Sequence, residues 1–227
     1  MSNKNEEKKV LVIAPHPDDE TIGAGGTIAK YSSKGANVFV IIVSGHLPPL
    51  YNRREYDITV SEACFAFEHL GVKNSEFLEI PATMIDDQPR HKVNGAIQKI
   101  VNDFCPHIVL CPYPDRHVDH RYVFDSAMVA TRPVGVGKNI EIVAAYETLS
   151  ETHWNAPHIE PNFTPNWVVD ITENIDNKLK ALECYKSQIS DFPGPRSLEA
   201  IESLAKFRGT QAGFSYGEGF HIIRKVS

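Results

Sequence analysis

The stretch that decides the fold is Val10–Gly26, which reads VLVIAPHPDDETIGAGG. Its first five residues, Val10–Ala14, are apolar and rich in branched side chains, which is typical of a strand buried on both faces of a parallel sheet. A polar turn follows, and a helical pattern then continues to about Lys34 and ends at Gly35, a residue suited to the left-handed position that closes a helix. The stretch predicts a strand and a helix joined by a polar turn.

The same alternation of strand and helix continues along the chain. Apolar runs predict strands, and longer periodic stretches predict the helices between them. The strands are expected at Val38–Val43, Glu76–Ile80 and His107–Cys111, and the helices at Thr59–Leu70 and Val93–Phe104. Helices that connect successive strands in this way favour an open, mostly parallel sheet with helices on both faces. We therefore expect an α/β fold, a Rossmann-like three-layer sandwich with a mostly parallel sheet.

The second half of the chain has a less regular pattern. Glu151–Pro165 carries three prolines and few periodic apolar positions, so we expect a long ordered loop there. The other expected elements are a helix from Arg121 to about Arg132, an apolar segment at Ile140–Tyr146, a strand at Val168–Ile171, a helix capped by Thr172 that runs to Gln188, a helix capped by Ser197 that reaches about Gln211, and a strand at Glu218–Ile223. Phe192–Pro195 reads as a rigid turn, so residues 1–227 are expected to form a single domain.

Composition and charge exclude several classes of protein. Hydrophobic residues make up 42% and charged residues 23% of the chain, which is typical of a soluble globular protein. There are 23 basic and 29 acidic residues, a formal charge of -6, and no block of like charges, so we expect no nucleic-acid partner. No apolar run suits a signal peptide or a membrane span, so we expect a cytoplasmic protein without membrane insertion. The four cysteines form no CxxC pair and are expected to be buried thiols.

Two groups of polar side chains follow two of the expected strands. Pro15–Glu20 comes directly after the first strand, and Asp115–His120 follows the strand that ends near Cys111. The carboxyl ends of parallel strands lie at one edge of a sheet, where ligands bind, so we expect the two groups to converge. Acidic residues before a helix are also ordinary capping residues. The second group, with its two histidines, favours a metal site over that simpler interpretation.

Three of these residues suit a catalytic zinc ion, which typically has three protein ligands and one position open for water. His16, Asp19 and His120 can supply those ligands. Asp18 is then free to accept a proton from the attacking water, and His117, one turn from His120, can polarise or protonate the reacting carbonyl. The same three ligands also match the two-histidine, one-carboxylate triad of a non-haem iron(II) oxygenase, although such triads are mostly found on all-β barrels.

With these motifs the chain resembles the PIG-L or LmbE-like deacetylase family. A His-Pro-Asp-Asp element stands at His16–Asp19 after the first strand, and a His-x-Asp-His element stands at His117–His120 after a later strand. The resemblance implies a mononuclear zinc ion (Zn²⁺) bound by His16, Asp19 and His120. It also implies hydrolysis of the N-acetyl group of an amino sugar, in a glycoside, nucleotide sugar or glycan precursor, by an enzyme that forms a homo-oligomer.

The resemblance further implies a role for each neighbouring residue. Asp18 would be the general base, His117 would stabilise or protonate the tetrahedral intermediate, Asp119 would orient the His117 imidazole, and Arg116 would contact the substrate. Many relatives carry an arginine where this chain has Thr59. A non-catalytic sugar-binding relative is the remaining alternative, but a protein that only binds a metal has no need of a free carboxylate such as Asp18.

The glycines at Gly23–Gly26 suggest a dinucleotide-binding loop at first sight. The third glycine of that fingerprint would have to stand at Ile28, and no acidic residue closes the second expected strand at Ser44. We therefore expect these glycines to let the first helix pack closely against the sheet.

Overall fold

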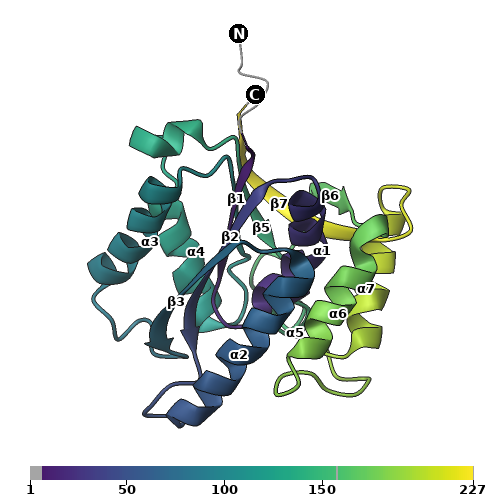
Figure 1. Cartoon of the computed structure of the whole chain (residues 1–227), viewed down its shortest axis with the longest axis horizontal. Helices are drawn as coiled ribbons and strands as arrows, with labels where there is room; N and C mark the ends of the chain where they lie inside the picture. The colour runs from purple at the N-terminus through teal and green to yellow at the C-terminus, as the bar shows by residue number, and fades with distance from the viewer. Residues whose placement is uncertain (1–6, 157, 227) are drawn as a thin grey trace.

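The computed structural model describes residues 7–156 and 158–226, which form one seven-stranded sheet with helices on both faces (Figure 1). The strands are β1 (Lys9–Ala14), β2 (Asn37–Gly45), β3 (Asn74–Pro81), β4 (Ile108–Pro112), β5 (Ile142–Tyr146), β6 (Trp167–Asp170) and β7 (Gly217–Lys225). The α-helices are α1 (Asp19–Ser33), α2 (Arg53–Leu70), α3 (Arg90–Phe104), α4 (Val118–Ala130), α5 (Leu149–Thr152), α6 (Ile175–Cys184) and α7 (Leu198–Thr210), and two 3-10 helices are η1 (Gly135–Asn139) and η2 (Thr172–Asn174).

The order of the strands places β1 and β4 side by side in the middle of the sheet. The order is β3-β2-β1-β4-β5-β7-β6, and every neighbouring pair is parallel except the two that involve β7. Val10 of β1, for example, pairs with Val38 of β2 on one side and Ile108 of β4 on the other. The strand order therefore reverses between β1 and β4, and a crevice at the carboxyl ends of the strands is expected at such a point.

The residues of β1 alternate between two hydrophobic cores. Val10 and Val12 pack with residues of α1, α2 and α6, whereas Leu11 and Ile13 pack with residues of α3 and α4. In Figure 1, α3 and α4 lie on one side of the sheet, and α1, α2, α6 and α7 lie on the other. All residues from Val10 to Ala14 are fully buried, which confirms the prediction of a strand covered on both faces in a mostly parallel α/β sheet.

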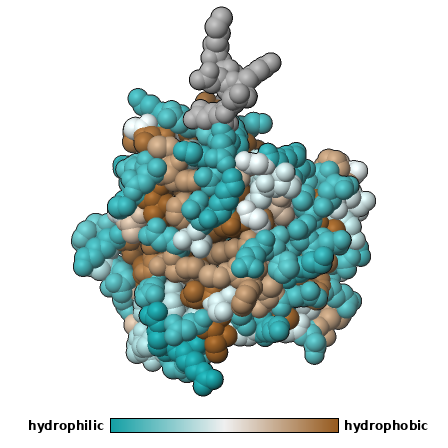
Figure 2. Space-filling view, viewed as in Figure 1, coloured by the Kyte–Doolittle hydropathy of each residue, from teal (hydrophilic) through white to brown (hydrophobic). Residues whose placement is uncertain are grey.

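The surface seen from this side is polar around its margins, and apolar residues show mainly across the middle (Figure 2). Within the described residues, no helix combines the length and the apolar character needed to cross a membrane. The prediction that all four cysteines are buried is correct for Cys111 and wrong for Cys64, which lies exposed on α2, while Cys105 and Cys184 are half-buried.

Most predicted elements are present, with shifted ends. The predicted C-caps Gly35 and Gly71 have the expected positive φ angles, 83° and 71°, and the Ser197 side chain caps α7 by accepting from the backbone N–H of Ala200. The prediction that Thr172 caps the next helix is wrong, because Thr172 lies in η2 and donates to the Asp170 carboxylate instead. That helix, α6, also ends before Gln188, at Cys184.

The start of α4 is the shift that matters for the site. The sequence pattern predicts a helix after Arg121, but α4 begins at Val118, with His117 as its N-cap. Asp119 and His120 therefore lie in the first turn of the helix, where their orientation is set by the helix geometry. Because β4 adjoins β1, this first turn faces the turn that follows β1.

The first helix approaches the sheet closely at its glycines, as predicted. A Cβ atom on Gly23 would lie 2.2 Å from Cδ2 of Tyr146, and one on Gly26 would lie 2.7 Å from Cδ1 of Ile171. We expect Gly23→Ala to lower the free energy of unfolding by about 1–3 kcal/mol, the usual cost of overpacking a core. Urea denaturation measures this difference. Gly95→Ala on α3 is the matched control, because its Cβ would contact nothing within 4 Å, and an equal loss in both variants would contradict the packing argument.

Candidate metal centre

The turn after β1 holds two buried carboxylates in a strained conformation. Asp18 has a φ of 120°, a value that non-glycine residues rarely adopt and that is found mainly at functional sites. Its carbonyl accepts a hydrogen bond from Ile22 (2.8 Å), and its N–H donates to Oε2 of Glu20 (3.2 Å). Asp19 begins α1. The side chains of Asp18 and Asp19 are almost completely excluded from solvent, with 1% and 0% of their residue surfaces exposed.

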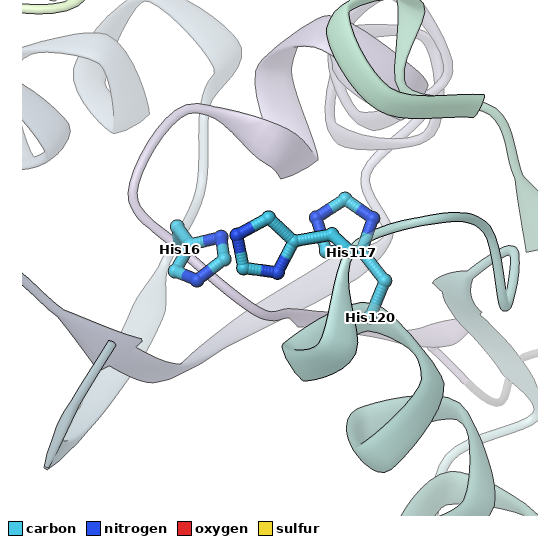
Figure 3. A group of neighbouring side chains, drawn as sticks. All are labelled: His16, His117 and His120. Carbon is cyan, nitrogen blue, oxygen red and sulfur yellow. The ribbon is translucent and has the colours of Figure 1, made fainter. Parts of the chain in front are cut away.

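Three histidines meet between this turn and the N-terminus of α4 (Figure 3). His16 comes from the turn after β1, and His117 and His120 come from the start of α4. One nitrogen from each ring lies within 4.8 Å of the other two, and the ring centroids of His16 and His117 are 4.7 Å apart. The predicted convergence of the two sequence motifs is therefore present in the fold.

Of the three residues predicted as metal ligands, His16 and His120 both contact the third, Asp19, at its Oδ2 atom. This oxygen lies 3.1 Å from Nδ1 of His16 and 3.3 Å from Nε2 of His120. Ligand atoms bonded at the usual distance of about 2.0–2.1 Å to a tetrahedral zinc ion are separated by about 3.3 Å. Nε2 of His120 and Oδ1 of Asp19 are buried without a hydrogen-bond partner among the described residues. The two unpartnered atoms fit a metal ion, and so do the distances from Oδ2 of Asp19 to the two histidine nitrogens.

The second nitrogen of each of these two histidines contacts another carboxylate. Nε2 of His16 lies 2.8 Å from Oδ2 of Asp119, and Nδ1 of His120 lies 3.0 Å from Oδ2 of Asp115. Metal-binding histidines commonly donate their other N–H to a carboxylate in this way, which fixes the tautomer and the ring orientation. The role implied for Asp119 differs accordingly: its carboxylate contacts His16, and only its backbone N–H contacts His117.

His117 differs from the other two histidines in its hydrogen bonding. Its Nδ1 accepts a hydrogen bond of 3.2 Å from the backbone N–H of Asp119, which can only donate. The proton of a neutral His117 ring is therefore on Nε2. His117 also lines the cavity described below.

The charges of the site follow from burial and from close neighbours. Burial lowers the pKa of His16 and of His120, but the hydrogen bonds and charges of the adjacent carboxylates outweigh it and raise these pKa values to about 9 and about 10. Burial, together with the charges of His16 and His120, lowers the pKa of His117 to about 4. Burial raises the pKa of Asp18 to about 7, although the nearby Arg196 guanidinium opposes this shift.

A cavity of about 190 Å³ opens beside these groups. His16, Asp18 and His117 form part of its wall, and the other polar residues in the wall are His46, Tyr51, Thr59, Thr83, Glu151, Gln188 and Arg196. Arg116, which was predicted to contact substrate, is half-exposed and forms an ion pair with Glu151 (2.5 Å). Glu151 belongs to the cavity wall, and Arg116 is not one of the residues of that wall.

Three residues of the site were not predicted from the sequence. Asp115 lies in the second motif but had no assigned role, and its carboxylate contacts both His120 and Thr152 (2.8 Å to Thr152 Oγ1). Glu151 and Arg196 come from segments without a motif. The position of Asp115 directly beyond a strand end was a usable signal, but no local pattern distinguishes Arg196 from a surface arginine.

The chain is similar to several known proteins. The sequence profile of the PIG-L family, GlcNAc-PI de-N-acetylase, matches residues 11–131. The chain is 29% identical to a diacetylchitobiose deacetylase of Thermococcus kodakarensis, over 96% of this chain and 84% of that protein. It is 26% identical to a probable N-acetyl-alpha-D-glucosaminyl L-malate deacetylase 2 of Bacillus anthracis, over 81% and 83%. The solved structure of an N,N'-diacetylchitobiose deacetylase from Pyrococcus horikoshii superposes with a TM-score of 0.76 at 28% identity, over 96% of this chain and 84% of that one.

Proposed function

Because the chain belongs to the PIG-L family, whose profile covers more than half of it, we propose that it is a zinc-dependent hydrolase that removes the N-acetyl group from an N-acetyl amino sugar. The observation that carries the proposal is that His16 and His120 both contact Asp19, next to the buried carboxylate of Asp18 and the neutral ring of His117. The names of both relatives above give a deacetylase of an N-acetylated sugar compound.

The metal would be held by Nδ1 of His16, Oδ2 of Asp19 and Nε2 of His120. When bound, zinc supplies a Lewis acid and lowers the pKa of a water molecule to about 7. The contacts of His16 with Asp119 and of His120 with Asp115 support this assignment, because the opposite nitrogen of each ring then lies beside Oδ2 of Asp19. We place His117 outside the ligand set, since its Nδ1 accepts from a backbone N–H and the proton of the neutral ring is therefore on Nε2.

Asp18 and His117 perform the remaining chemistry. Asp18 accepts the proton of the water that attacks the acetyl carbon, and a base with a pKa near 7 suits this task at neutral pH. The Nε2 proton of His117 donates to the carbonyl oxygen, where negative charge develops as the carbon becomes tetrahedral. When the C–N bond breaks, the proton held by Asp18 passes to the departing amine, which leaves acetate and the free amino sugar.

The size of the cavity limits what can enter it. At about 190 Å³ it lies below the roughly 300–1,000 Å³ of pockets for drug-sized ligands. One acetamido sugar residue suits this volume, so that any attached group would remain outside the cavity.

We also assign the whole chain to a single domain of the Rossmann-like three-layer type, which is supported by one sheet with a hydrophobic core on each face.

Acetate release tests the proposed function. The zinc-loaded protein would be incubated with N-acetylglucosamine, N,N'-diacetylchitobiose and glycosides of N-acetylglucosamine, and acetate and free amine would be measured together. We expect release from at least one of these sugars and none from an acetylated lysine peptide, which cannot make the contacts of a sugar ring. A protein with bound zinc that releases no acetate from any amino sugar would contradict the proposal.

The affinity for zinc should depend strongly on pH. The raised pKa values of His16 and His120, about 9 and about 10, mean that both rings carry a proton at pH 7 in the metal-free protein. Zinc binds the neutral rings, so its binding releases up to two protons, and the apparent affinity falls as the pH decreases below about 9. Chelator competition from pH 6 to 9 should give a slope of up to about 2 log units per pH unit. A flat profile would show that these histidines are not the ligands.

A further inference from the structure

The carboxylate of Asp18 is buried without the hydrogen bonds that normally fix such a group. Neither Oδ1 nor Oδ2 has a hydrogen-bond partner among the described residues, and only 1% of the residue surface is exposed. A buried carboxylate in this condition is costly unless another group compensates its charge. The strained backbone of Asp18 determines where the side chain begins, but it leaves open which way the two oxygens turn.

One cation stands beside this carboxylate. Nε of Arg196 lies 3.1 Å from Oδ2 of Asp18, and this nitrogen is also buried without a hydrogen-bond acceptor. The two groups therefore face each other in close ionic contact, although the contact does not have the alignment of a hydrogen bond. Both oxygens of Asp18 are buried, and the residue belongs to the wall of the cavity, so its carboxylate lies between Arg196 and the cavity.

The segment that carries Arg196 is well anchored. It connects α6 with α7, and its backbone is tied by hydrogen bonds from Gly194 N to Asp191 O (2.8 Å) and from Ser197 N to Gly194 O (3.0 Å). Ser197 then caps α7. The Arg196 side chain reaches from this anchored turn into the cavity wall that it shares with Asp18 and His117. A charged side chain on such an anchored turn can hold its partner in one orientation.

We propose that Arg196 is a positioning residue for Asp18: its contact with Oδ2 holds the carboxylate in the orientation in which it accepts the proton of the attacking water at the cavity wall. This inference rests on the proposed function, in which Asp18 is the base. A general base must lie within hydrogen-bond reach of the proton that it takes, and a misplacement of about 1 Å can reduce the rate by about 100-fold. Arg196 therefore acts on the rate of the chemical step through Asp18, and it contributes little to substrate affinity.

The kinetic test compares Arg196→Gln and Arg196→Lys with the wild type, all loaded with zinc. We expect Arg196→Gln to lower kcat by about 10–100-fold with KM changed less than about threefold, and Arg196→Lys, which keeps the charge, to recover part of kcat. Millimolar guanidinium added to Arg196→Ala should restore activity in part. Arg132→Gln, on the exposed residue just beyond α4, is the matched control and should retain wild-type kcat.

A structural readout keeps the inference independent of turnover. In crystals of Arg196→Gln, the Asp18 carboxylate should be rotated away from its wild-type orientation or spread over several, with His16, Asp19 and His120 unmoved. An unchanged Asp18 carboxylate, a wild-type kcat, or a rise in KM without a loss of kcat would each overturn the inference. Inactive wild-type protein with bound zinc would instead count against the proposed function, and the crystals of the variant would still decide the role of Arg196.

Discussion

Asp18→Asn should lower kcat by about 100- to 10,000-fold while the protein keeps its zinc, because removal of a general base typically has an effect of this size. The substitution preserves the shape of the side chain but removes its ability to accept a proton. Asn also tolerates positive φ values better than most residues, so that the turn with φ 120° should retain its conformation. Steady-state kinetics, together with zinc content measured by atomic emission, would test this expectation.

The matched control for Asp18→Asn is a carboxylate outside the site. Glu199→Gln changes the first turn of α7 and should leave both kcat and zinc content within a factor of two or so of the wild type, since surface charges of this kind have small effects. If Asp18→Asn retains more than about a tenth of the wild-type kcat, the assignment of Asp18 as the base is wrong. If the variant loses its zinc, Asp18 belongs to the metal ligands instead.

His120→Ala is expected to lose the metal itself. Removal of an outer partner of a metal ligand typically weakens metal binding by 10–100-fold, so the loss of a ligand should exceed about 100-fold. Nε2 of His120 is 3.3 Å from Oδ2 of Asp19, and no described group forms a hydrogen bond with this nitrogen. Chelator competition would measure the zinc affinity, and circular dichroism would verify that the variant folds. Activity should be lost in parallel with zinc.

Two further variants make the loss at His120 interpretable. His91→Ala, on the exposed face of α3, should bind zinc like the wild type. His117→Ala should also keep its zinc and yet lose activity, because His117 is placed at the reacting carbonyl and not at the metal. The three histidine nitrogens lie within 4.8 Å of one another, so a loss of zinc in His117→Ala would place His117 among the ligands and contradict its proposed role.

The strands of the parallel core and their order along the chain could be predicted from local pattern. Val10–Ala14 is apolar at every position because both of its faces are covered, and such a run has few interpretations when a helix follows it directly. Helix ends with a glycine were also predictable, since Gly35 and Gly71 adopt positive φ angles that other residues avoid. The start of α4 was not predictable, because His117 caps the helix with a ring nitrogen and histidine is not a usual N-cap.

By itself, the sequence determined which residues stand at the carboxyl ends of the strands: His16, Asp18 and Asp19 after β1, and His117 and His120 after β4. These positions follow from short-range periodicity, which is visible in a local stretch of sequence without the rest of the chain. Tertiary structure alone decided that β1 and β4 are neighbours, that Asp119 and Asp115 each contact a different histidine, and that Arg196 reaches Asp18. Contacts of this kind join segments far apart in the chain, and they depend on the packing of the whole sheet and its helices, which no local pattern encodes.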